Sequence, residues 1–162
     1  MNDIKVIDEL FKNNENDRIL KEIKLLKFKK GEVDRKNTLP TGKICLIKKT
    51  SYIYKTFLEI FKKHNFIPKN KKLIRSYINL FEPNENPYYH SDGKGVTTFL
   101  YYAVDFNEYN FDFGGETLFI NNPLIQGIVP KKHRLVIFTN EIVHRATPFR
   151  NFNRYTIVFK YK

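Results

Sequence analysis

The 162-residue sequence has no tryptophan, one methionine and a single cysteine, Cys45. One cysteine cannot form a disulfide within the chain, which is typical of proteins from a reducing compartment. The sequence also lacks an apolar run of the roughly 20 residues that a membrane-spanning helix needs. Its N-terminus has no apolar core followed by small residues, which argues against a secretory signal. We therefore expect a cytoplasmic protein without a membrane segment.

Acidic residues are scarce: 17 Asp and Glu stand against 29 Lys and Arg, which gives a formal net charge of +12. Most of the excess lies in residues 1–72. A charge of this size would attract nucleic acid or another acidic partner. We favour a simpler explanation. The chain is rich in lysine because it comes from an AT-rich genome, and many of these lysines lie exposed to solvent on a helical surface.

The rest of the composition is that of a folded chain, with 41% hydrophobic residues, 15 Phe and 10 Tyr. Aromatic residues at this level favour strands over disorder. The length fits one domain, 1–162, which is large enough to bury a substantial core. We expect residues 1–72 to be mainly helical support with one long loop, and residues 73–162 to form the core.

Helical periodicity is confined to the N-terminal part. Apolar residues recur three and four apart in residues 4–11, with Asp3 as the candidate N-cap, in 19–26 and in 53–61. After residue 72 short strands follow one another between turns, which predicts an antiparallel sandwich or barrel. The expected strands cover 43–48, 73–81, 96–104, 117–120, 125–129, 135–138, 143–148 and 155–161.

Two stretches of the strand region carry residue types that bind metals. His90 and Asp92 stand two positions apart in an extended segment, where such side chains point the same way. His144, in a later strand, is the best candidate for a third ligand. Two imidazoles and one carboxylate suit Fe(II) and leave coordination positions open. The His-x-Asp pair alone is weak evidence, because it occurs by chance in many proteins.

The order of the motifs is more specific than the pair. The pair is followed by a Gly-Gly turn at 114–115, by His144, and by Arg154 ten positions later. In this the sequence resembles the Fe(II)/2-oxoglutarate-dependent dioxygenases, and most closely their prolyl 4-hydroxylase-like branch. The resemblance covers nearly the whole chain and is strongest over residues 73–162. It implies an α+β fold, a double-stranded β-helix (jelly-roll) core with N-terminal supporting helices.

The resemblance also implies a reaction. His90, Asp92 and His144 would be the catalytic residues and the ligands of Fe(II). The cosubstrate 2-oxoglutarate would bind Arg154 and Tyr102 through its far carboxylate. With O2, and with ascorbate as a candidate further cofactor, the reaction would hydroxylate a C–H bond and release succinate and CO2. A prolyl residue in a protein or peptide is the first candidate substrate.

Two positions depart from the family pattern. Phe81 stands where the family often has a tyrosine, which removes one hydroxyl from the pocket. Lys160 stands where relatives often have an apolar or aromatic residue. We expect neither change to touch the iron ligands. We also expect His64 and His133 to lie outside the site, with His133 exposed in a basic turn.

The loop from Gly31 to Gly42 stands where the family's prolyl hydroxylases carry a mobile loop that closes over the substrate. Bounding glycines and few apolar anchors favour such a lid, in which Arg35 and Lys36 would contact the substrate. An ordinary solvated connection is an equal alternative.

Two alternative functions stay open. An AlkB-like oxidative demethylase would act on nucleic acid, and such relatives generally carry two arginines six positions apart after the distal histidine. Here Arg154 and Lys160 keep the spacing without the residue type. A non-catalytic jelly-roll binding module is the other alternative, although such a module has no reason to keep the four residues of the site. The sequence leaves the substrate and the oligomeric state undecided.

Overall fold

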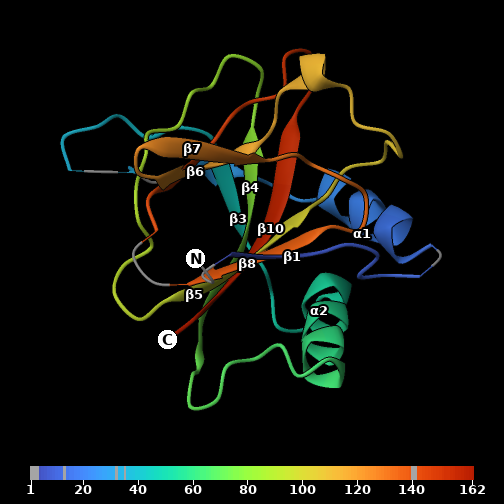
Figure 1. The fold of residues 1–162 in the computed structure, drawn as a ribbon. Helices are drawn as coiled ribbons and strands as arrows, with labels where there is room; N and C mark the ends of the chain where they lie inside the picture. The colour runs from blue at the N-terminus through green and yellow to red at the C-terminus, as the bar shows by residue number, and fades with distance from the viewer. Residues whose placement is uncertain (1–3, 13, 32, 35, 140–141) are drawn as a thin grey trace.

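The computed structural model describes residues 4–12, 14–31, 33–34, 36–139 and 142–162. These residues form two α-helices, one 3-10 turn and ten strands (Figure 1). In chain order the elements are β1 (Ile4–Ile7), α1 (Glu15–Lys24), β2 (Lys29–Lys30), β3 (Lys43–Leu46), α2 (Tyr52–Lys63), β4 (Leu73–Phe81), β5 (Thr97–Tyr102), η1 (Phe111–Phe113), β6 (Thr117–Asn121), β7 (Leu124–Ile128), β8 (Leu135–Thr139), β9 (His144–Ala146) and β10 (Arg154–Tyr161). No helix in these ranges is long and apolar enough to cross a membrane.

The strands form two antiparallel sheets. The larger sheet has seven strands in the order β1-β8-β5-β10-β4-β3-β2, and the smaller has three in the order β7-β6-β9. β10 is the central strand of the larger sheet, between β5 and β4. Neighbouring strands are mostly far apart in sequence, as in a double-stranded β-helix. The predicted α+β jelly-roll with supporting helices is confirmed.

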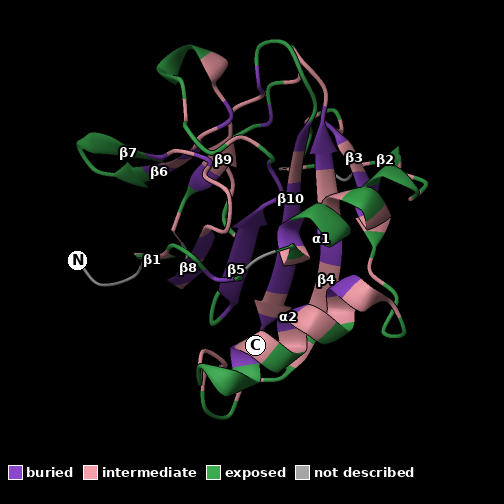
Figure 2. Ribbon diagram, turned by 90° about the vertical axis from the view of Figure 1, so that its right-hand side faces the viewer, coloured by how far each residue is buried: buried purple, intermediate pink, exposed green. Residues whose placement is uncertain are grey.

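Both helices lie against one face of the larger sheet (Figures 1 and 2). α2 presents Ile53, Phe57 and Phe61 on one side at helical spacing, and all three are buried. They meet aromatic rings of β5: Phe57 lies 5.1 Å from Tyr101, and Phe61 lies 4.7 Å from Phe99, between ring centroids. This aromatic layer fills the helix side of the sheet and leaves the other face for the site.

A serine cap sets the start of α2. Ser51 has extended backbone dihedral angles, and its side-chain oxygen accepts a hydrogen bond from the Tyr54 backbone N–H at 3.2 Å. Ser51→Ala should remove this bond and lower the free energy of unfolding by about 1 kcal/mol, which is a fall in Tm of roughly 2–4 °C. Thr50→Ala, at the exposed preceding position, is the control. Equal losses for both variants in thermal denaturation would argue against the cap.

The N-terminal segment differs from the prediction. Residues 4–7 form β1 and pair with β8, so the helix expected over residues 4–11 is wrong. Ile7 packs on the helix-side core and Ile4 on a second core between the two sheets. A spacing of three puts these side chains on opposite faces of a strand, and the same spacing fits one face of a helix. The helices of the described residues before β4 are α1 and α2, and Asp3 lies outside the described residues.

Side chains of β10 alternate between the two faces of the larger sheet. Ile157 and Phe159 belong to the helix-side core, whereas Val158 belongs to the core between the sheets. Arg154 and Lys160 have the same parity as Val158. Both cations therefore lie on the face that looks toward the smaller sheet.

The adjacent tyrosines of β5 face opposite layers, as alternation along a strand requires. Tyr101 is buried on the helix side, where its hydroxyl donates a hydrogen bond to the Asn16 side chain at 2.5 Å. Asn16 in turn donates to the Val104 carbonyl oxygen at 2.9 Å, so α1 is tied to the sheet. Tyr102 belongs to the core between the sheets, on the side of the candidate site.

Candidate active site

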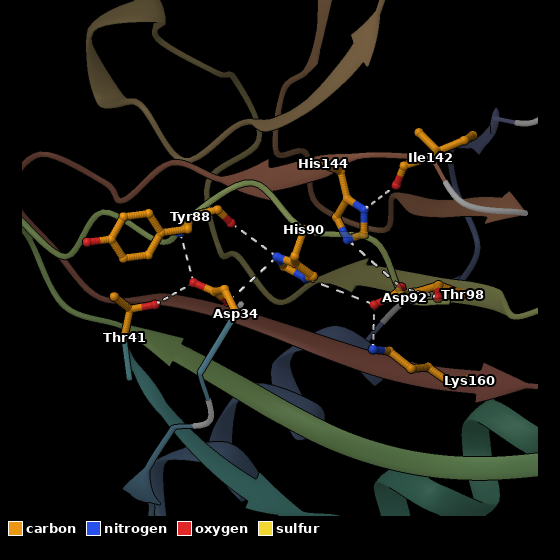
Figure 3. Close-up of polar contacts among 9 residues, drawn as sticks. All are labelled: Asp34, Thr41, Tyr88, His90, Asp92, Thr98, Ile142, His144 and Lys160. Atoms are coloured by element: carbon orange, nitrogen blue, oxygen red, sulfur yellow. Dashed lines mark hydrogen bonds and ion pairs between the residues drawn. The ribbon is translucent and has the colours of Figure 1, made fainter. Parts of the chain in front are cut away.

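His90, Asp92 and His144 line one cavity between the two sheets (Figure 3). His144 begins β9, and its backbone pairs with that of His90 in an isolated antiparallel bridge. Each of these residues donates its backbone N–H to the carbonyl of the other, at 3.0 and 2.9 Å. Because Asp92 follows His90 by two residues, this bridge brings all three side chains together.

Backbone carbonyls orient the two imidazole rings. His90 Nδ1 lies 3.1 Å from the Tyr88 carbonyl oxygen, and His144 Nδ1 lies 2.9 Å from that of Ile142. A carbonyl oxygen only accepts hydrogen bonds, so Nδ1 carries a proton and Nε2 is the nitrogen that is left to bind a metal. The Nε2 atoms lie 4.0 Å (His90) and 3.9 Å (His144) from the two carboxylate oxygens of Asp92.

These donors fit a divalent metal. One ligand atom from each of the three residues lies within 4.8 Å of the others. Two imidazole nitrogens and a carboxylate on one side of an ion are the ligand set of non-haem Fe(II) sites. Within the described part of the chain, this is the only group of three or more His, Cys, Asp or Glu side chains arranged in this way.

The other two histidines lie outside the group, as predicted. His64 is exposed at the C-terminal end of α2, where its ring stacks on Phe66 at 5.3 Å. His133 is half-buried, with its ring 6.5 Å from that of Phe11, so the expectation of an exposed side chain is wrong. The apolar residues of the N-terminal segment cover this turn.

Burial and hydrogen bonds set the charges of the candidate ligands. Burial lowers the pKa of His144, which favours the neutral imidazole that binds metals. Asp92 accepts hydrogen bonds from Lys160 Nζ on Oδ1 and from Thr98 Oγ1 on Oδ2, both at 2.5 Å. Burial alone would raise the pKa of Asp92, but the Lys160 ammonium and the Thr98 hydroxyl outweigh it and hold the pKa below its usual range. Asp92 is therefore ionised, as a carboxylate ligand of a metal has to be.

The contact of Lys160 with Asp92 overturns one expectation. The prediction that the change at position 160 does not touch the iron ligands is wrong. β10 places Lys160 directly opposite Thr98 of β5, and both side chains reach the same carboxylate. Lys160 thus reaches the candidate triad through Asp92, and Arg154 is the strand's other cation on this face.

Arg154 lines the same cavity and is 1% exposed. Its Nε donates to the Gly115 carbonyl oxygen at 2.8 Å, and one terminal nitrogen donates to Thr117 Oγ1 at 3.0 Å. No carboxylate of the described residues forms an ion pair with it, and burial lowers the pKa of its guanidinium. A buried cation of this kind is stabilised by an anionic ligand with which it can form bidentate hydrogen bonds.

The Gly-Gly turn before β6 supplies one of these contacts. Gly115 has a φ of +88°, and a Cβ atom there would lie 2.2 Å from the ring of Phe149. A side chain would have to displace that ring or shift the backbone of Gly115, whose own carbonyl oxygen accepts from Arg154. The glycine is therefore required by the close approach of these two segments.

Tyr102 reaches Arg154 through Thr117. Its hydroxyl lies 2.7 Å from Thr117 Oγ1 and 2.9 Å from the Ile128 carbonyl oxygen, and its ring lies 5.5 Å from the guanidinium. Phe81 lines the cavity, with its ring 5.9 Å from the same guanidinium. The structure brings Tyr102 to Arg154, and its contact with a cosubstrate stays a prediction.

One contact of the site has no signal in the sequence. Asp34 Oδ1 lies 3.6 Å from His90 Nδ1 (Figure 3), and the other oxygen accepts from the Tyr88 N–H at 2.8 Å and from the Thr41 hydroxyl at 3.0 Å. The Gly31–Gly42 loop is therefore anchored beside a candidate metal ligand. Only the folded chain brings this aspartate to the histidine, because the two lie far apart in sequence.

No protein-family model matches the sequence, and no curated protein matches it. Solved structures do match. A prolyl hydroxylase of Trichoplax adhaerens, in complex with a hypoxia inducible factor oxygen degradation domain peptide fragment, is 19% identical with a TM-score of 0.75, and the match covers 99% of this chain and 84% of that one. The viral collagen prolyl hydroxylase of Paramecium Bursaria Chlorella virus-1, as its 2-oxoglutarate complex, is 17% identical with a TM-score of 0.68, over 98% and 94% of the chains.

A third match is an oxidoreductase of the 2OG-Fe(II) oxygenase family from Burkholderia pseudomallei, 12% identical with a TM-score of 0.72, over 98% of this chain and 85% of that one. The chain has the 2OG-Fe(II) oxygenase fold. Within this oxygenase fold, His90, Asp92 and His144 form a facial triad at the cavity between the sheets. The resemblance seen in the sequence is thus confirmed at the level of the fold.

Proposed function

We propose that the chain is an Fe(II)- and 2-oxoglutarate-dependent dioxygenase that hydroxylates a C–H bond, with a prolyl residue of a protein or peptide as the first candidate substrate. The observation that carries this proposal is one cavity lined by both the triad and Arg154, a buried guanidinium to which no described carboxylate is paired. A metal site alone would not need that cation. A non-catalytic binding module would need neither the triad nor the buried guanidinium.

The triad would hold the iron through His90 Nε2, His144 Nε2 and the Asp92 carboxylate. When bound, iron and 2-oxoglutarate supply the redox chemistry with O2, in which the cosubstrate is converted to succinate and CO2 and the substrate gains one oxygen. The chain's own part is to present the ligands in one orientation. The Tyr88 and Ile142 carbonyls do so for the imidazoles, as described above.

Arg154 would bind the far carboxylate of 2-oxoglutarate. Two of its donors bind Gly115 and Thr117, which fix the plane of the guanidinium inside the cavity. Tyr102 would support the same carboxylate site, directly or by holding Thr117 at 2.7 Å. A guanidinium fixed in this way loses little conformational entropy when the cosubstrate binds.

The peptide in the Trichoplax adhaerens prolyl hydroxylase supports a peptide substrate for this chain as well. The test is mass spectrometry of candidate proline-containing peptides after incubation with the protein, Fe(II), ascorbate and 2-oxoglutarate. A gain of one oxygen that is absent with His144→Ala is the expected result. Oxidation of methylated nucleic acid in place of peptides would favour the AlkB-like alternative, and no turnover of 2-oxoglutarate under any condition would favour the binding module.

The loop from Gly31 to Gly42 is the candidate substrate lid. Because Asp34 and Thr41 anchor it beside His90, a test of the lid must keep these two residues. Replacing residues 36–39 with a Gly/Ser sequence should depress peptide hydroxylation and leave uncoupled 2-oxoglutarate decarboxylation nearly unchanged, because a lid acts only on the bound substrate. Arg35, the other predicted contact, lies outside the described residues.

The two rates are measured by peptide mass spectrometry and by succinate formation. If both survive the replacement, the loop is a connector. Recognition would then have to be sought first in residues 105–112, which precede the Gly-Gly turn.

A further inference from the structure

Lys160 and Asp92 form a buried ion pair inside the candidate metal site. Their side chains are 16% and 4% exposed, and Nζ lies 2.5 Å from Oδ1 (Figure 3). The sheet does not require this pair, because β10 is already hydrogen-bonded to β4 and β5 on its two sides. The pair therefore calls for an explanation in terms of the site.

We propose that Lys160 is a positioning residue that serves as a placeholder cation: in the metal-free protein it orients and compensates the Asp92 carboxylate, and it thereby lowers the affinity of the site for a divalent metal. The inference rests on the proposed function, because it takes Asp92 to be a metal ligand.

The orientation follows from two donors on neighbouring strands. Lys160 and Thr98 stand directly opposite each other, and each donates to one oxygen of Asp92. Held in this way, each carboxylate oxygen lies near one imidazole, Oδ1 near His90 and Oδ2 near His144. Without Lys160, Thr98 would be the one residue of the described chain that still donates a hydrogen bond to the Asp92 side chain, and a buried carboxylate without a compensating cation is costly.

The sign of the effect on metal affinity follows from comparing the two states. In the metal-free protein Lys160 is the cation that compensates Asp92. In the metal-bound protein the metal compensates Asp92 itself and repels the adjacent ammonium. Removing the positive charge therefore destabilises the metal-free state more than the metal-bound state, so the metal should bind more tightly. At an effective dielectric constant of about 20, the bare repulsion between an ammonium and a divalent ion a few ångströms away would change the affinity by far more than tenfold. Screening and relaxation of the side chain reduce it, so we expect a change of about tenfold or more.

A second effect of the substitution has the opposite sign, because the carboxylate also loses one of its two positioning donors. This effect is the smaller one. Thr98 still holds Oδ2 from a paired strand, and a side chain that is 4% exposed has little room to turn. The electrostatic effect should therefore decide the outcome.

The test is titration of the metal-free protein with Co(II), followed by visible absorption and calorimetry, together with thermal denaturation with and without the metal. Lys160→Met should bind Co(II) about tenfold or more tightly, and its metal-free Tm should fall by roughly 5–15 °C. The metal-loaded Tm should fall less. Lys160→Arg should stay near the native values, and Lys55→Met, at an exposed site on α2, is the control for loss of one positive charge.

The outcomes separate this inference from the proposed function. If the native protein binds Co(II), His144→Ala does not, and Lys160→Met binds no more tightly, the placeholder is wrong and the metal site stands. If the native protein binds Co(II) no better than His144→Ala, the proposed function fails, and the inference fails with it. If Lys160→Met does not fold, Lys160→Gln takes its place, because glutamine is neutral but keeps a hydrogen-bond donor. Its Co(II) affinity is then compared with that of the native protein in the same way.

Discussion

His144→Ala is expected to abolish 2-oxoglutarate turnover and to leave the fold intact. The substitution removes one of the three candidate ligands, and a non-haem Fe(II) site of this kind needs two imidazoles and one carboxylate. The bridge to His90 is made by backbone atoms and survives. The ring packs 4.7 Å from Phe138 and 5.8 Å from Phe119, so some stability should be lost, but the strands around it remain paired.

Succinate formation measures the turnover, and circular dichroism measures the fold. His64→Ala removes an exposed histidine and should change neither measurement. His133→Ala should also keep the turnover, although this ring lies beside Phe11 and contributes to packing. Full turnover in the His144 variant would refute the assignment of the metal ligands.

Arg154→Ala should weaken 2-oxoglutarate binding far more than it weakens metal binding. Loss of a charge-assisted bidentate pair in a buried pocket costs roughly 2–5 kcal/mol, which is tenfold or more in affinity. Metal binding should change little, because Arg154 donates its hydrogen bonds to Gly115 and Thr117, neither of which is a candidate metal ligand. Arg154→Met, which fills more of the space, separates the loss of charge from the loss of volume.

Calorimetric titration of the metal-free protein with Mn(II) gives the metal affinity, and titration of the Mn(II)-loaded protein with 2-oxoglutarate gives the cosubstrate affinity. Arg150→Ala is the matched control, because Arg150 is an exposed arginine of the same segment that donates to the Asp112 carbonyl oxygen. An unchanged affinity for 2-oxoglutarate in the Arg154 variants would assign the carboxylate to another base. Lys160 would be a poor substitute, since it is paired with Asp92.

The strands of the core could be predicted from the sequence because alternation and turn residues are local signals. The strand expected at 73–81 coincides with β4, and the other expected strands overlap β3 and β5 to β10. The helix α2 could also be predicted, because its apolar residues recur at helical spacing and Ser51, a residue type that favours the N-cap, stands just before it. The triad could be predicted from the order of its motifs, but not from any single residue.

What the sequence could not reveal depends on pairing between distant segments. β1 is a strand because the edge of β8 is available to it, which no local pattern in residues 4–11 records. Lys160 meets Asp92 only because the register of β10 with β5 sets it opposite Thr98. Asp34 reaches His90 from a loop whose course depends on the fold. In each case the partner lies too far along the chain for spacing to predict it.

The side chains of β10 that face the smaller sheet also limit where residues can be inserted into or deleted from this protein. Arg154 and Lys160 stand on one unbroken strand, and the register shift of β10 comes only after Lys160. One residue inserted between them would turn one of the two cations into the helix layer. Two inserted residues would restore the face but move the cations about 7 Å further apart. The site can therefore diverge by substitution along β10, whereas insertions and deletions are tolerated only in the loops that surround it.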